Sequence, residues 1–308
     1  MIFFLNRLIF LTLTIIFLQS TVYAESRTIN MEKVSAAVAK GDVEVIHFMG
    51  NSYFEGLYGN PKDYNKAFEW YEKSAKLGYT KSQIAVADMY FNGFGTNKDP
   101  AKGIEWLQKA INKNDTNAMV LLAIMYSKGN IIEKNTKKYI ELLKKADALG
   151  NYGATYLLGV AYLQGNGLEK NQDKGIELLT NASNHGNTVA QSVLGSIYYQ
   201  GKLINQDYTK ALTYLLKAAE SNDNSAEFLL GYMYEKGHGV EKDKVKAKEW
   251  YERSKAHGNK TAELMINLLF LSSVHDKFHR TLILSGFCLL KIAKISLNSS
   301  FFPKPIKR

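Results

Sequence analysis

A unit of 36 residues recurs along this chain, marked by a small residue, a tyrosine and a glycine. In the fourth copy these markers are Gly159, Tyr162 and Gly165. Six copies occur, the first of them one residue out of step, and a half-copy follows at residues 261–272. A fixed period of this size is typical of a helical solenoid. We therefore expect an all-α solenoid of about six helix–loop–helix repeats with terminal capping helices.

The first helix of each copy is indicated by apolar residues at helical spacing, as in Ala154, Leu158 and Ala161. We expect Gly159 and Tyr162 to be buried, with the tyrosine packed into the space beside the small residue. Gly165 is expected to end the helix, because glycine tolerates the left-handed conformation. The small residue recurs in every copy as Gly50, Ala87, Ala123, Gly159, Gly195 and Gly231.

The second helix is predicted to begin at a capping residue, because Asp or Asn recurs there and accepts hydrogen bonds from free backbone N–H groups. These caps are Asp63, Asp99, Asn135, Asn171, Asp207 and Asp243. Three residues later stands a lysine, against the direction favoured by the helix dipole. A structural role explains this if the lysine covers apolar surface or pairs with an acid; a functional stripe of charge is the alternative. The helices end at residues that tolerate the left-handed conformation: Gly78, Asn114, Gly150, Gly186, Asn222 and Gly258.

The recurring pattern A-x3-LG-x2-Y-x2-G-x-G-x3-[DN]-x2-K-[AG]-x2-W resembles the Sel-one-like repeat, a relative of the tetratricopeptide repeat. Copy six, AEFLLGYMYEKGHGVEKDKVKAKEWYERSKAHG, follows it closely, and the resemblance covers residues 43–272. The resemblance implies a right-handed α/α superhelix that acts as a binding scaffold, often exported in bacteria, with no shared catalytic motif. Some exported relatives staple each repeat with a disulfide, and this chain lacks those cysteines.

The net charge of +10 is unevenly distributed. Seven basic residues and one acidic residue follow His275, and Arg7 adds a further positive charge, so residues 25–275 carry only +3. The repeats are nearly balanced in charge, which argues against a nucleic-acid groove along them.

Residues 1–24 have the pattern of a secretory signal peptide, with Arg7 before an apolar core and a small-residue site ending at Ala24. We expect cleavage after Ala24; an uncleaved anchor is the alternative. Residues 25–42 are expected to hold an N-terminal capping helix, because terminal repeats need a distinct outer face. Residues 43–272 form the solenoid, whose half-repeat is expected to cover the last full unit with Met265, Ile266, Leu268 and Leu269.

Residues 273–308 form a basic and apolar tail outside the repeat pattern. Its ten-residue uncharged stretch, TLILSGFCLL, is too short for a transmembrane helix. Three interpretations stay open: a capping helix, a segment that makes weak contact with a membrane surface, and a poorly ordered end.

Catalytic and metal chemistry find little support in the sequence. Cys288 is the single cysteine, so it is either a buried small residue, a free thiol or a link to another molecule. His275 and His279 have a spacing that can bind metal on a helix, but no third ligand follows at a recognisable distance. We expect no catalytic residues, no cofactor and no metal.

The candidate binding surface is the inner wall lined by the first helices, as the tetratricopeptide-like resemblance implies. Aromatic residues with a few polar groups suit protein or peptide recognition, although about half of the set is expected to serve packing between repeats instead. The expected partner-binding residues are Phe54, Asp88, Phe91, Tyr156, Val160, Leu163, Ser196, Tyr199, Phe228, Tyr232 and Glu235.

We expect an exported monomer, periplasmic or extracellular, that binds a protein or peptide partner. Two alternatives stay open. One is an envelope-associated enzyme acting on cell-wall fragments, and the other is a membrane-surface structural protein held by its tail.

Overall fold

The computed structural model describes residues 31–271, and this part of the chain is helical, with no strand. Its helices from α3 to α14 have 13 residues each, so the repeat is regular in length as well as in sequence. The elements are α2 (Met31–Ala39), α3 (Val43–Glu55), α4 (Tyr64–Lys76), α5 (Thr80–Asn92), α6 (Pro100–Asn112), α7 (Thr116–Lys128), α8 (Thr136–Ala148), α9 (Tyr152–Gln164), α10 (Gln172–Asn184), α11 (Thr188–Gln200), α12 (Tyr208–Glu220), α13 (Asn224–Lys236) and α14 (Lys244–Ala256).

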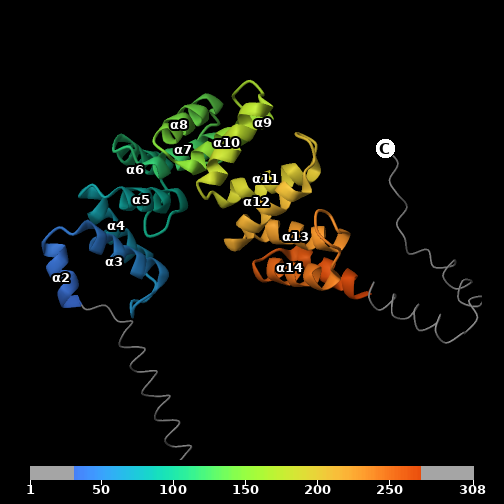
Figure 1. Ribbon diagram of the computed structural model, residues 1–308. Coiled ribbons are helices and arrows are strands. Elements are labelled where there is room, and N and C mark those ends of the chain that lie inside the picture. Colours follow the sequence, from blue (N-terminus) through green and yellow to red (C-terminus); the bar gives the residue numbers. More distant parts are fainter. Residues whose placement is uncertain (1–30, 272–308) are drawn as a thin grey trace, which may run out of the picture. The chain divides into compact units, whose positions relative to one another are not determined.

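Two compact units divide the chain between Asn187 and Thr188. Unit 1 contains α2 to α10, and unit 2 contains α11 to α14 with a further helical stretch at residues 260–271. Within each unit, an odd-numbered helix and the next even-numbered helix pack as a hairpin, and successive hairpins stack (Figure 1). The paired, all-helical repeats confirm the predicted fold class, while the handedness of a superhelix through both units stays a prediction.

The small residues of the first helices are all buried, as predicted. The side chain that fills the space beside Gly159 is Leu179 of α10, because an added Cβ on Gly159 would lie 3.1 Å from Leu179 Cγ. The prediction that Tyr162 fills this space, fully buried, was wrong: Tyr162 is half-buried at the edge of the hairpin. The repeat position of Leu179 holds a large buried residue in every copy: Tyr71, Leu107, Leu143, Leu179, Leu215 and Tyr251.

The predicted caps of the second helices are confirmed. Each of the six Asp or Asn side chains accepts a hydrogen bond from the backbone N–H of the lysine three residues later. The six residues expected to end these helices, from Gly78 to Gly258, all have positive φ, between 60° and 97°. At both ends of each second helix, free backbone groups are therefore satisfied by residues nearby in the sequence.

The tyrosine recurring in the first helices joins the two helices of a hairpin. Its carbonyl accepts a hydrogen bond from the cap residue of the second helix, as in Asn171 N to Tyr162 O at 3.0 Å. The recurrent lysine lies over the tyrosine ring in five of the six repeats, with Nζ 5.1–5.7 Å from the ring centroid. Lys174 pairs instead with Glu177. The lysines are structural, which explains their unfavourable place in the first turn.

Helical residues flank the six repeats at both ends. The expected N-terminal helix is present as α2 and packs on α3. At the other end, Ala262 and Leu269 are buried against α14, and Met265 and Ile266 pack beside them. Leu268 is 49% exposed, so its expected place on the packed face was wrong.

Within residues 31–271, no helix is long and apolar enough to cross a membrane. The signal-like segment, its cleavage site after Ala24, and the tail with His275, His279 and Cys288 lie outside the described residues.

Candidate binding surface

Unit 2 brings the predicted site residues of two first helices together. Ser196 and Tyr199 lie on α11, and Phe228, Tyr232 and Glu235 lie on α13, which contacts α11 directly. The rings of Tyr199 and Tyr232 meet edge to face, with centroids 6.2 Å apart. All five side chains are half-buried, so each is both anchored and accessible.

Two aromatic residues that the sequence analysis did not single out complete this surface. His238 Nδ1 lies 2.9 Å from the Tyr199 hydroxyl, and the His238 ring stacks on Tyr208 with centroids 4.9 Å apart. Tyr208 follows the cap of α12, and His238 lies between the two glycines of the α13–α14 loop. We call Tyr199, Tyr208, Tyr232 and His238 the aromatic cluster. The sequence signal that could have identified His238 is an aromatic ring between two glycines in a loop.

Glu235 places a carboxylate beside the aromatic cluster. Its Oε2 accepts a hydrogen bond of 2.9 Å from the hydroxyl of the buried Tyr251, which fixes the carboxylate on α13. Its Oε1 lies 2.5 Å from Lys236 Nζ, and the same ammonium lies 5.3 Å from the centroid of the Tyr232 ring. The carboxylate is only 15% exposed and is held by two partners.

Tyr199 and Tyr251 keep their protons well above neutral pH. Burial, with smaller contributions from Tyr232 and Tyr208, raises the pKa of Tyr199 to about 12. Burial and the hydrogen bond to Glu235 also raise the pKa of Tyr251. The hydrogen bond to Glu235 raises the pKa of Lys236. The surface therefore offers neutral hydroxyls and aromatic faces around one ion pair.

The equivalent place in the first two repeats of unit 1 is more apolar. Phe54 packs against Tyr64, Phe94 and Tyr71, with centroids 5.1, 6.0 and 6.4 Å away. Tyr64 and Phe94 stack at 4.9 Å. Counting along the repeats, Phe54, Tyr64 and Phe94 occupy the positions of Tyr199, Tyr208 and His238.

Phe91 and Leu163, two other predicted contacts, face the second helix of their own repeat. An added Cβ on Gly103 would lie 2.4 Å from Phe91 Cε1, and one on Gly175 would lie 2.6 Å from Leu163 Cδ2. Phe91 is only 4% exposed. Phe91 therefore serves packing within the hairpin, and Leu163 is half-buried there.

The other predicted residues of unit 1 do not form such a cluster with one another. Asp88 is exposed on α5 and accepts a hydrogen bond of 2.9 Å from Asn92. Tyr156 and Val160 are half-buried one turn apart on α9, and burial raises the pKa of Tyr156. Their role in binding stays a prediction.

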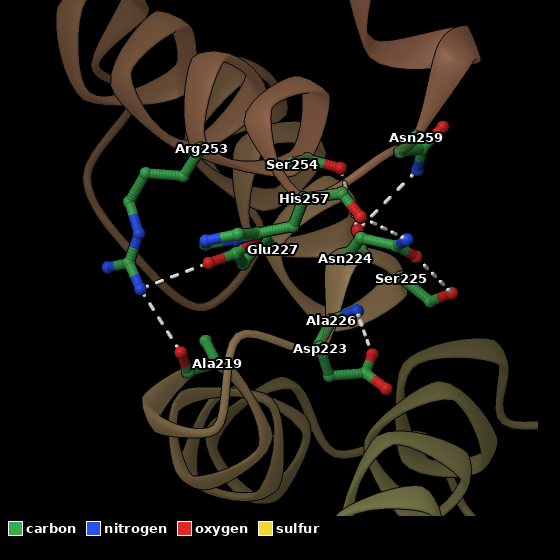
Figure 2. Close-up of polar contacts among 10 residues, drawn as sticks. All are labelled: Ala219, Asp223, Asn224, Ser225, Ala226, Glu227, Arg253, Ser254, His257 and Asn259. Carbon is green, nitrogen blue, oxygen red and sulfur yellow. Dashed lines mark hydrogen bonds and ion pairs between the residues drawn. The ribbon is translucent and has the colours of Figure 1, made fainter. Parts of the chain in front are cut away.

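The last repeat also contains a buried carboxylate that the sequence analysis missed. Glu227 of α13 is fully buried, with Arg253 Nη2 3.0 Å from its Oε1 and His257 Nδ1 2.7 Å from its Oε2 (Figure 2). Arg253 also donates to the carbonyl oxygen of Ala219, in the preceding repeat, at 3.1 Å. These contacts join α13, α14 and the end of α12.

The nearby hydroxyls are not arranged for catalysis by His257. Ser254 Oγ donates to the carbonyl oxygen of Asn224 at 2.6 Å, and Ser225 Oγ donates to Asn224 Oδ1 (Figure 2). A nucleophile would need its hydroxyl within hydrogen-bond reach of the base. Within residues 31–271 no group of three His, Cys, Asp or Glu side chains could hold a metal ion.

A family model described as the Sel1 repeat matches residues 43–79, 80–115, 116–151, 153–187, 188–223 and 224–259. These six matches coincide with the six hairpins from α3–α4 to α13–α14. Curated proteins gave no match.

Two solved structures resemble the chain over most of its length. A Sel1 repeat protein from Oxalobacter formigenes is 30% identical to this chain, with a TM-score of 0.67. The match covers 77% of this chain and 68% of that protein. A protective antigen of uropathogenic Escherichia coli strains, with an SLR fold, is 28% identical to this chain, with a TM-score of 0.62. The match covers 78% of this chain and 51% of the antigen. The present chain thus spans about half of that antigen.

Proposed function

Because this chain belongs to the Sel1 repeat family, we propose that it is a scaffold that binds a protein or peptide partner through the first helices of its repeats. The observation that carries this proposal is the surface on α11 and α13. There, Tyr199, Tyr232 and Glu235 are half-buried, lie close together and are held by second-helix residues. Rigid aromatic side chains of this kind are the usual anchors of protein interfaces.

Unit 1 contains separate candidates for partner binding among the predicted residues that are accessible. Tyr156 and Val160 of α9 and Asp88 of α5 are the candidates there, while Phe91 contributes packing. We assign no catalytic step to the protein and expect it to need no cofactor.

We also propose that the protein is exported, to the periplasm or beyond the cell. The support is the signal-like sequence of residues 1–24 and the description of one similar protein as a protective antigen. N-terminal sequencing of the protein recovered from the envelope or medium should begin at Glu25. Recovery from the cytoplasm with Met1 in place would reject export.

The binding proposal is tested by affinity capture from envelope extract, followed by measurement of the captured partner's affinity for variants. Tyr156→Ala combined with Tyr232→Ala should weaken binding about tenfold or more, because each removes an aromatic anchor. Tyr198→Ala is the matched control, since Tyr198 stacks on Tyr214 of its own hairpin beside Lys210. It should leave affinity unchanged.

Loss of folding must be separated from loss of binding. Ser196→Arg adds bulk on the surface without removing a packed ring, and it should also weaken binding. Circular dichroism should show all variants equally helical. Unchanged affinity in both the double variant and Ser196→Arg would refute the proposal. If replacing the basic residues of the tail abolished binding instead, the site would lie in residues 273–308.

A further inference from the structure

We propose that the aromatic cluster and Glu235 form a docking site for a basic side chain, lysine or arginine, of the partner. This inference rests on the proposed function and specifies the chemistry recognised at its centre. The site consists of aromatic faces beside one fixed carboxylate, which is the combination that attracts a cation.

A cation is already present beside Glu235 and Tyr232. Lys236 Nζ lies 2.5 Å from Glu235 Oε1 and 5.3 Å from the Tyr232 ring centroid. Lys236 is at the exposed end of α13, and its side chain is 41% exposed, so it can swing away into water. An ammonium in this position shows that the site is compatible with the head group of a partner's lysine, and it acts as an internal competitor.

The rings of the aromatic cluster differ in orientation. Tyr208 and His238 are nearly parallel, at 13°, whereas Tyr232 is steeply tilted to Tyr199 and to His238, at 77° and 72°. The cluster therefore presents faces in different directions around one place. Cations bind over ring faces within about 6 Å of the centroid.

Unit 1 lacks the carboxylate at the equivalent position. The repeat position of Glu235 is occupied there by Phe91, which is buried, and that of Tyr232 by Asp88. Lys62 Nζ lies 5.0 Å from the centroid of Tyr64 and 6.0 Å from that of Phe54. A lysine over aromatic rings therefore recurs in unit 1, but the fixed carboxylate beside the rings is found in unit 2.

The test uses blocked five-residue peptides that differ only at the central position: lysine, arginine, norleucine or glutamate. Binding to the full chain is followed by NMR at the ring signals of Tyr199, Tyr232 and His238. The lysine and arginine peptides should bind at least about tenfold more tightly than the other two, and their affinity should fall as salt is raised.

Two variants separate recognition from structural support. Lys236→Met removes the internal competitor and should tighten the lysine peptide about fivefold, a gain that a merely structural Lys236 would not give. Glu235→Gln should weaken the same peptide about tenfold. Lys210→Met is the control, because Lys210 lies over Tyr198 and pairs with Asp207. It should not change the affinity.

Equal binding of the norleucine and lysine peptides, or no gain from Lys236→Met, would overturn the inference. The chain's own tail is the alternative occupant. It is tested in the full chain with Lys304→Gln, Lys307→Gln and Arg308→Gln combined. If this variant binds the lysine peptide more tightly, the tail and not a partner fills the site, and the inference is overturned. If a captured partner needs Tyr156 and Tyr232 for binding but the lysine peptide does not bind, this inference is refuted and the proposed function stands.

Discussion

The first two repeats and the last two place different chemistry at the same five positions. In unit 1 these positions hold Phe54, Tyr64, Asp88, Phe91 and Phe94. In unit 2 they hold Tyr199, Tyr208, Tyr232, Glu235 and His238. The rings approach to similar distances in both, 4.9–6.0 Å among the three aromatics of unit 1 and 4.9–5.8 Å among Tyr199, Tyr208 and His238. The two pairs of repeats thus share the geometry of the rings and differ in their polarity.

A second pair of equivalent positions shows the same trend. Gln83 Nε2 donates to the carbonyl oxygen of Ala75 in the preceding repeat, at 3.2 Å. At the equivalent position Glu227 is fully buried, and it holds Arg253, which donates to the equivalent carbonyl of Ala219. The contact with the preceding repeat is made by a neutral amide in unit 1 and, in unit 2, by the guanidinium of Arg253, which Glu227 holds. We infer that the chemistry of this contact can differ from one repeat to another.

The largest expected effect concerns this pair. Glu227→Ala should lower the free energy of unfolding by about 3 kcal/mol, because it leaves Arg253 without its partner carboxylate and His257 without its hydrogen-bond partner. This is at the low end for a broken buried pair, since Arg253 and His257 are partly exposed. Gln83→Ala should cost about 1 kcal/mol, the contribution of one neutral hydrogen bond. Denaturant unfolding of both variants checks this; equal losses would remove the distinction between the two contacts.

Exchanging the loop residues should give a smaller, asymmetric effect. Phe94→His should cost about 2 kcal/mol, because it inserts a polar ring between Phe54 and Tyr64, where no hydroxyl matches the one that Tyr199 offers to His238. His238→Phe should cost about 1 kcal/mol or less, since it loses one hydrogen bond but gains apolar contact. Thermal melting measures both, and a larger loss in His238→Phe would reverse our account.

The smallest expected effect is at the Tyr199 hydroxyl. Tyr199→Phe should cost about 1 kcal/mol at pH 8, through loss of the hydrogen bond to His238. The pKa of Tyr199 is raised to about 12, so its contribution is complete below pH 10 and is lost as the pH rises to 12, because the unfolded chain releases the proton first. The variant should therefore lose less stability than the wild type between pH 10 and 12. Denaturant unfolding at pH 8, 10 and 11 tests this, and parallel curves would contradict it.

Much of the hairpin could be predicted because its determinants are local. The caps at Asp63 and its equivalents, and the left-handed ends at Gly78 and its equivalents, depend on a few consecutive residues. They recur in every copy, so chance agreement is excluded. The structural role of the lysines was also predictable, from their unfavourable position near the start of a helix.

The site was harder to predict because its partners come from other helices, either of the same repeat or of the neighbouring one. His238 meets Tyr199 of the preceding repeat across 39 positions, and Arg253 meets Glu227 of its own repeat across 26 positions. The repeat pattern identifies which residues share a position but not which positions touch. The expectation for Tyr162 failed for the same reason: the ring beside Gly159 was assigned within one helix, whereas Leu179 comes from the other.

Because each second helix is capped by residues of its own repeat, the number of repeats in the gene can change. Each 36-residue unit carries its own caps for its second helix, so duplication or deletion of one unit leaves the ends of the remaining second helices capped. The first repeat shows that single-residue insertions are also absorbed, since its extra residue lies in the loop between Glu55 and Tyr64, where Tyr58 and Gly59 have positive φ. Copy number can therefore vary among descendants of such a gene without new capping residues, and each added unit supplies another first helix on which surface residues can diverge.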